Sequence, residues 1–190
     1  MTTVRLDQLS AATGEIDRAE LLDLYRIAVD EVRFEVTLNW QRTQYYFTVN
    51  TAVIAVAATI LRVSGIEAAP VVAMLFFLGF ACARLGQRMI EHGHTYYRRA
   101  VYKKTLIERL LGRFQTVGGF DYAGANLGIT TTEGMAEITE ILEDPDAYIN
   151  RKPRAGTVTY RLVRLMAVFS IVELVATLLC LGLAASRLLK

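Results

Sequence analysis

The sequence predicts an all-α integral membrane protein with three transmembrane helices and long cytoplasmic helical extensions. Hydrophobic residues make up 53% of the 190 positions, and the mean hydropathy is +0.32. The apolar residues gather in three runs that are nearly free of charge. A soluble domain of this length normally has a negative mean hydropathy, so the pattern indicates membrane-spanning helices rather than one large soluble core.

The first apolar run extends from Thr43 to Leu61 and has 19 residues without a charge. As a helix it would be about 28 Å long, close to the thickness of the hydrocarbon core. The aromatic residues Tyr45, Tyr46 and Phe47 stand at its start, where such rings favour the membrane interface. We predict a first span over residues 43–62, after an N-terminal cytoplasmic helix over residues 1–42.

The second run, Ala68 to Ala83, has 16 uncharged residues. It is long enough to cross only if Arg84 and Arg88 extend their side chains toward water, which gives a predicted span over residues 70–88. Residues 63–69 are then a short outer loop. A connection of this length predicts a tight hairpin of two antiparallel helices.

The third run, Leu165 to Ser186, has 22 residues and one charged residue, Glu173. We predict a third span over residues 165–186, followed by an outer tail, 187–190. Residues 89–164, between the second and third spans, form a second cytoplasmic helical region with a Gly-rich loop at 116–132 and a short acidic helix that stops at Asp144-Pro145.

The distribution of Lys and Arg predicts the orientation. Residues 1–44 carry five, residues 62–70 one, residues 84–164 thirteen, and the tail after Ser186 two. Positively charged loops stay in the cytoplasm, so the N-terminus and the middle region are expected inside, and the hairpin tip and the C-terminus outside.

The helix that leads into the first span has no Gly or Pro between Glu15 and Ser64. Its apolar residues recur at steps of three and four and form one stripe. A chain of this size cannot cover such a stripe alone, so we predict an oligomer interface there. The predicted interface residues are Tyr25, Val29, Val32, Val36 and Trp40.

Two polar residues lie inside the predicted spans. An ionised Glu173 near the middle of the third span would cost at least about 2.5 kcal/mol, so it must face a partner, a cavity or a subunit interface. Two interpretations stay open: a pore-lining or titrating group, and a protonated or hydrogen-bonded clamp between helices. Asn50, in the first span, has the same two interpretations, and an interhelical hydrogen bond is favoured for it.

The basic run Arg98, Arg99, Lys103 and Lys104 could contact anionic lipid headgroups. A solvated helix face with charges that set topology is the favoured alternative. The cluster Glu91-His92-Gly93-His94 has metal-ligand residue types, but its two histidines do not share a helical face. We therefore predict no metal, no cofactor and no catalytic residues. The formal net charge of +2 also argues against a nucleic-acid partner.

The stretch from Leu24 to Ala58 resembles the opening of small bacterial membrane proteins of the RipA-type octameric and SLATT-type effector kinds. The matching positions are Leu24, Tyr25, Asn39, Arg42, Phe47, Asn50 and Thr51. This resemblance implies a homo-oligomer in the bacterial inner membrane, and the SLATT-type likeness further implies a pore-forming effector. Both groups have two spans, whereas this chain adds a third.

The leading functional hypothesis is a homo-oligomeric structural or interaction assembly whose partners are copies of itself and membrane lipids. One alternative is a pore-forming channel or effector with Glu173 or Asn50 facing the pore. Another is a membrane-anchored subunit that docks a soluble cytoplasmic regulator through residues 114–150. If the stripe is an interface, Val32→Asp or Val36→Asp should dissociate the complex without unfolding the spans.

Overall fold

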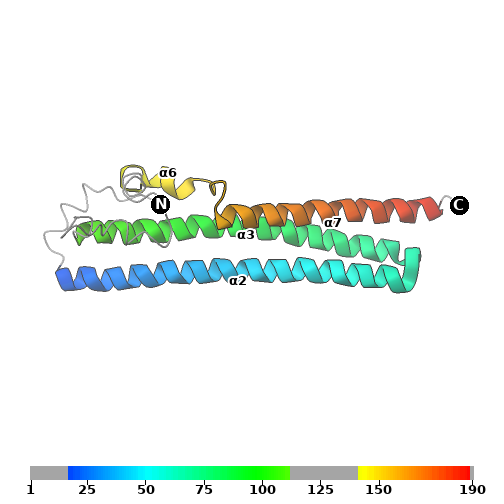
Figure 1. Ribbon diagram of the computed structural model, residues 1–190, viewed down its shortest axis with the longest axis horizontal. Helices are drawn as coiled ribbons and strands as arrows, with labels where there is room; N and C mark the ends of the chain where they lie inside the picture. Colours follow the sequence, from blue (N-terminus) through cyan, green and yellow to red (C-terminus); the bar gives the residue numbers. More distant parts are fainter. Residues whose placement is uncertain (1–16, 112–140, 189–190) are drawn as a thin grey trace. The chain divides into compact units, whose positions relative to one another are not determined.

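The computed structural model describes residues 17–111 and 141–188, and these residues form helices and no strand (Figure 1). In chain order the elements are α2 (Arg18–Ser64), the 3₁₀ helix η1 (Gly65–Ala68), α3 (Ala69–Leu110), α6 (Pro145–Asn150) and α7 (Val158–Leu188). The all-α prediction is confirmed for these residues. The predicted Gly-rich loop, residues 116–132, lies outside them, as does most of the segment 114–150.

The connection between α2 and α3 differs from the predicted outer loop. α2 continues to Ser64, and the four residues of η1 lead directly into α3. Gly65 adopts a φ of 63°, a left-handed conformation that favours glycine. Pro70 falls in the first turn of α3, where a missing N–H costs little.

Because the connection stays helical, two helical stretches rather than three qualify as membrane spans by length and composition among residues 17–111 and 141–188. They are Arg18–Leu110, with 93 residues, and Val158–Arg187, with 30 residues. The prediction of three separate apolar helices is corrected to this extent. The first stretch contains both apolar runs of the sequence, one in α2 and one in α3.

The chain divides into two compact units. The first, here called the α6 unit, comprises residues 17–37, 95–111 and 141–151 of the described chain. Its core holds Val101, Ile141, Tyr148 and Ile149, with Val32 packed against them.

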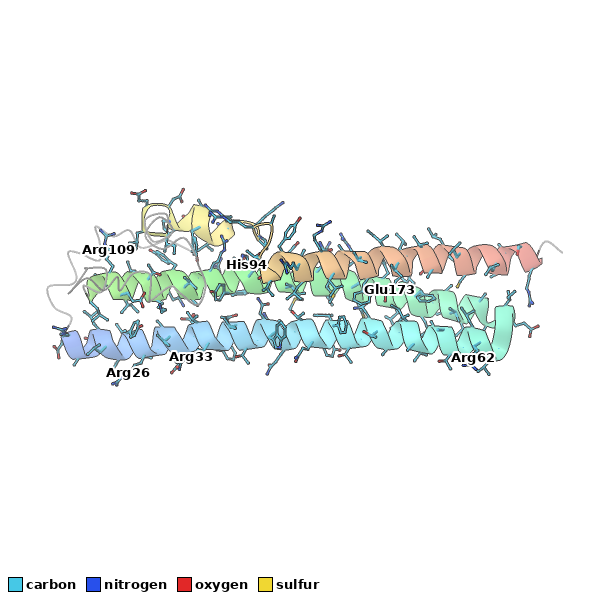
Figure 2. The ribbon with its side chains drawn as sticks, in the orientation of Figure 1. Arg26, Arg33, Arg62, His94, Arg109 and Glu173 are labelled. Atoms are coloured by element: carbon cyan, nitrogen blue, oxygen red, sulfur yellow. The ribbon has the colours of Figure 1, made fainter. Side chains whose placement is uncertain are left out.

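Two local features of the α6 unit are the start of α6 and the exposed arginines of α2. Asp144-Pro145, which was predicted only to stop a helix, also starts α6, because the Asp144 side chain accepts from the Ala147 N–H and Pro145 occupies the first turn. On α2, Arg26 and Arg33 point away from the helix into solvent (Figure 2).

The second unit, here called the α7 unit, comprises residues 38–94 and 152–188. One end of it is held by a cluster of Ala57, Val72, Ala73 and Cys180.

Within the α7 unit, α2 and α3 pack through glycines that recur every seven residues on α3. A Cβ atom at Gly79, Gly86 or Gly93 would meet, in that order, Val53, Tyr46 and Asn39 of α2, and these are also seven residues apart. Partner numbers that fall on α2 as they rise on α3 mark an antiparallel pair, and the seven-residue spacing is that of coiled coils. The hairpin prediction therefore agrees with the packing of these helices.

Candidate functional site

The α7 helix carries its polar residues on its inner face. Residues at steps of three and four are buried: Met166, Ser170, Glu173, Thr177 and Cys180. The outer face is apolar and exposed: Val168, Ile171, Val172, Leu174, Val175, Leu178, Leu179, Leu181 and Leu183. This is the reverse of a water-soluble helix, and it is the arrangement expected where lipid surrounds the outer face.

Glu173 lies on the inner face of α7 and is completely buried (Figure 2). Its carboxyl group fills the space beside Gly79 of α3: a Cβ atom there would lie 2.5 Å from Oε1. Neither carboxyl oxygen has a hydrogen-bond partner among the described residues. Glycine at position 79 therefore makes room for a carboxyl group that its surroundings do not pair.

Asn50 of α2 is also completely buried. Its Nδ2 donates to the Tyr46 carbonyl oxygen at 2.6 Å, while its Oδ1 accepts no hydrogen bond within the described chain. The amide is thus held by its own helix through its nitrogen, and its oxygen is available to a donor.

Two contacts show that Asn50 and Glu173 lie at the same level. The centroids of the Phe47 and Phe169 rings are 5.7 Å apart. The Arg187 guanidinium nitrogen lies 3.5 Å from Oε1 of Glu67, which belongs to η1 directly after α2. Residue numbers rise together along α2 and α7 between these contacts, so the two helices run in parallel. Asn50 follows Phe47 by three residues and Glu173 follows Phe169 by four.

The hydroxyl groups next to Glu173 are already engaged. Ser170 Oγ donates to the Ala167 carbonyl at 2.8 Å, and Thr177 Oγ1 donates to the Glu173 backbone carbonyl at 2.7 Å. Two buried acceptor groups, the Glu173 carboxyl and the Asn50 side-chain oxygen, therefore lie at one level of the unit without a donor among the described residues, and the neighbouring hydroxyls direct their protons elsewhere.

The residues of the predicted interface stripe do not share one environment. Tyr25, Val29 and Val32 are partly buried, whereas Val36 and Trp40 are 49% and 54% exposed. The inner face of α2 includes Ala28, Thr43, Asn50 and Ala57, which are small or polar residues. The interface assignment stays a prediction, and only its exposed members are available to another chain.

The four basic residues that could contact lipid headgroups also differ in their environments. Arg98 is buried, donates to the Tyr148 carbonyl oxygen and stacks its guanidinium 4.8 Å from that ring's centroid. Lys104 lies 2.7 Å from Glu108. Lys103 pairs with Glu31 at 2.6 Å but stays 56% exposed, and Arg99 is exposed with its guanidinium over Tyr96. A lipid-headgroup role stays a prediction, for which Lys103 and Arg99 have the required exposure.

A second buried glutamate, Glu108, was not singled out from the sequence. Its Oε1 accepts from the Tyr25 hydroxyl at 3.1 Å and pairs with Lys104 Nζ, and the residue is fully buried. The four-residue spacing of Lys104 and Glu108 was the available signal. Tyr25 comes from a distant part of the sequence, so only the fold reveals this contact.

Within the described residues, no group of three or more His, Cys, Asp or Glu side chains could hold a metal ion. In the histidine cluster, His92 is exposed, and Gly93 is buried with the Asn39 side chain against it. Within that cluster, Gly93 therefore takes part in the packing between α2 and α3.

The model of the octameric membrane protein family (8xMP) matches residues 22–184. Comparison with curated proteins and with solved structures finds no significant match. The family match confirms the expected likeness to octameric membrane proteins and does not extend to the narrower RipA-type and SLATT-type names. The family description implies a membrane location and self-association. Because the match covers most of the sequence, the chain belongs to the octameric membrane protein family.

Proposed function

We propose that this protein is a homo-oligomeric assembly of the bacterial inner membrane with a structural or interaction role and no catalytic activity of its own. The observation that carries the proposal is α7, whose outer face is apolar while its buried face holds Ser170, Glu173 and Thr177. Polar groups turned inward and aliphatic groups turned outward suit a helix surrounded by lipid and by other helices.

We further propose that the chain crosses three times, at residues 43–62, 70–88 and 165–186. The antiparallel packing of α2 and α3 supports two crossings within the stretch 18–110. With the basic residues kept inside, the N-terminus is cytoplasmic and the C-terminus is outside. Compartment-specific reporters fused to the two ends test this topology. Opposite compartments are expected, and a shared compartment would contradict an odd number of crossings.

For self-association we propose two different surfaces on α2. Successive residues rotate by about 100° around a helix, so Val36 and Trp40 form one flank beside the buried stripe, and Ile27 and Phe34 form another nearly on the opposite side of the helix. All four are between 49% and 64% exposed. Two distinct apolar flanks suit head-to-tail contacts between copies, which close into a ring when the rotation allows.

Head-to-tail contact makes a specific prediction for two variants. Phe34→Asp places a negative charge on one flank and Val36→Asp places one on the other. Each variant alone should therefore lose its higher oligomers in native mass spectrometry. An equimolar mixture should form one-to-one heterodimers, because each variant supplies the flank that the other lacks. A mixture that stays monomeric, or a single variant that keeps its stoichiometry, would contradict the head-to-tail arrangement.

Two further variants serve as controls. Thr37→Asp adds the same charge at an exposed position beside Val36 and should leave the assembly intact. Val32→Asp should instead unfold the α6 unit, because Val32 packs against the core of its own chain. This separates two substitutions that the sequence alone treats as equivalent.

The observations favour this assembly over a pore lined by Glu173 and Asn50. A pore between copies would be lined by outward-facing residues, whereas both of these side chains are fully buried within one chain. Planar-bilayer recordings test the alternative: a conductance that disappears in Glu173→Ala would favour the pore.

A further inference from the structure

We propose that Glu173 and Asn50 form a proton-binding site in the α7 unit, in which the protonated Glu173 carboxyl donates to Asn50 Oδ1. The inference rests on the proposed membrane location of this unit. It adds to the assembly a group that can take up and release a proton inside the membrane.

The site has hydrogen-bond acceptors without a donor, and a proton on Glu173 would supply that donor. Glu173 and Asn50 present buried oxygens without a donor at one level of the unit. A carboxylic acid has one O–H to donate, and Asn50 Oδ1 has lone pairs to accept it. One proton would therefore satisfy an acceptor on each of two helices at once.

The surrounding elements offer no positive charge that could keep Glu173 ionised. Residues 43–61 of α2 and 68–83 of α3 contain no charged residue, and no ion pair involves Glu173 in the described chain. The other titratable side chains nearest in sequence register are Tyr46 on α2, Cys82 on α3 and Cys180 on α7. All three are neutral in their protonated forms. An ionised carboxylate would thus be buried without compensation.

A proton fits the site better than a metal cation. Hard cations such as Ca²⁺ and Mg²⁺ take about six to eight oxygen ligands. The two residues supply three oxygens, and the hydroxyls of Ser170 and Thr177 are bonded to backbone carbonyls. A proton needs only one donor atom and one acceptor.

Gly79 makes the site possible. A methyl group at this position would overlap the Glu173 carboxyl, because the distance to Oε1 would be 2.5 Å. Gly182, on the same helix as Glu173, has open space around its Cβ position and is the matched control. Gly79→Ala should therefore displace the carboxyl from Asn50, while Gly182→Ala should leave it in place.

Infrared spectroscopy of the full-length protein in lipid bilayers tests the proposal directly. The wild-type protein at neutral pH should show the carbonyl band of one protonated carboxylic acid per chain, and Glu173→Gln should lose it. Glu67→Gln, at a carboxyl on the hairpin that is mostly exposed, should keep it. A wild-type spectrum without this band at neutral pH would overturn the proposal.

Asn50→Ala tests the hydrogen bond without removing the carboxyl. The band should remain and move to higher frequency, as expected for a carboxylic acid that has lost its acceptor, and the same shift is expected in Gly79→Ala but not in Gly182→Ala. An unchanged band in Asn50→Ala would refute the pairing. If Glu173→Gln fails to fold, these variants still decide the question.

A last arm separates a proton from a metal cation. The band should be the same in sodium and in choline buffers, and a band that disappears on adding sodium would show that a metal ion replaces the proton. Native mass spectrometry of the same samples reports the assembly independently. A wild-type protein that lacks the band at neutral pH but keeps its oligomers would reject the site and leave the proposed function standing.

Discussion

Among the described residues, each of the two units buries one glutamate completely, and the two glutamates have opposite environments. In the α6 unit, Glu108 pairs with Lys104 at 2.7 Å and accepts from the Tyr25 hydroxyl. In the α7 unit, Glu173 has no hydrogen bond or ion pair within the described residues. The same side chain is therefore held by a partner in one unit and by apolar packing in the other.

This difference follows from the side chains that surround each glutamate. A buried carboxylate is tolerated when a cation and further hydrogen bonds accompany it, as in the α6 unit. In the proposed membrane-spanning unit, the neighbouring segments 43–61 and 68–83 contain no charged residue, and bringing a lysine there would add a second charge to desolvate. The chain instead leaves a small space beside Gly79 and places an amide oxygen at the same level.

Removing the cation that pairs with Glu108 should have the largest effect on stability. Lys104→Met keeps the aliphatic stem but leaves a buried carboxylate without its cation, so we expect the α6 unit to lose about 3–5 kcal/mol of stability. Lys103→Met is the matched control, because its pair with Glu31 is exposed and should be worth less than about 1 kcal/mol.

Hydrogen exchange of the backbone amides in the α6 unit measures both of these effects. Equal losses for the two lysine variants would show that burial does not distinguish the pairs.

The glycine packing of the α7 unit can be tested with a smaller substitution. In Gly86→Ala the new methyl would come within 2.8 Å of the Tyr46 ring, and overpacking of this kind should cost about 1–3 kcal/mol. Gly182→Ala should be neutral or stabilising by up to about 1 kcal/mol, because its Cβ meets nothing and alanine favours helix.

Thermal unfolding in detergent, followed by circular dichroism, compares the two glycine variants. A stable Gly86→Ala protein would mean that α2 and α3 do not approach each other closely at this position.

The smallest expected effect is a pH dependence of the α6 unit. Burial, and then the negative charge of Asp146, raise the pKa of Tyr102 above its ordinary value of 10.0. Between the unfolded and the folded pKa, the folded state holds a proton that the unfolded state has lost. Stability therefore falls as the pH rises above about 10.

Tyr102→Phe should make this fall shallower. The free energy of unfolding of the α6 unit, measured on both sides of pH 10, gives the slope. Tyr96→Phe, at an exposed tyrosine of the same unit, is the control. An identical slope in the wild type and in Tyr102→Phe would contradict the assignment.

Several parts of the architecture could be predicted because they depend on local pattern. The long helix before Ser64 follows from the absence of Gly and Pro, and the hairpin follows from the short connection between two apolar runs. The contacts of Gly86 and Gly93 could not be predicted in the same way. A glycine within a helix indicates only lower helix stability until the neighbouring helix is known. Here the side chains of Tyr46 and Asn39 occupy the space beside Gly86 and Gly93.

The inner face of α2 could not be read from apolar periodicity for a related reason. Val36 and Trp40 continue an apolar series along the sequence, yet the helix turns them outward, and the buried positions belong to Ala28, Thr43, Asn50 and Ala57. Close approach of two helices selects small residues, and hydrophobicity alone does not identify them.

Composition and periodicity, which are properties of short segments, were enough to predict that this chain is helical, that its apolar residues suffice to cross a membrane, and that Glu173 is unusual. The packing of the helices was needed to learn which glutamate has a cation, which glycines face which side chains, and that Asn50 lies level with Glu173. Those facts depend on the register between helices that are far apart in the sequence, and register is set by side-chain packing between them.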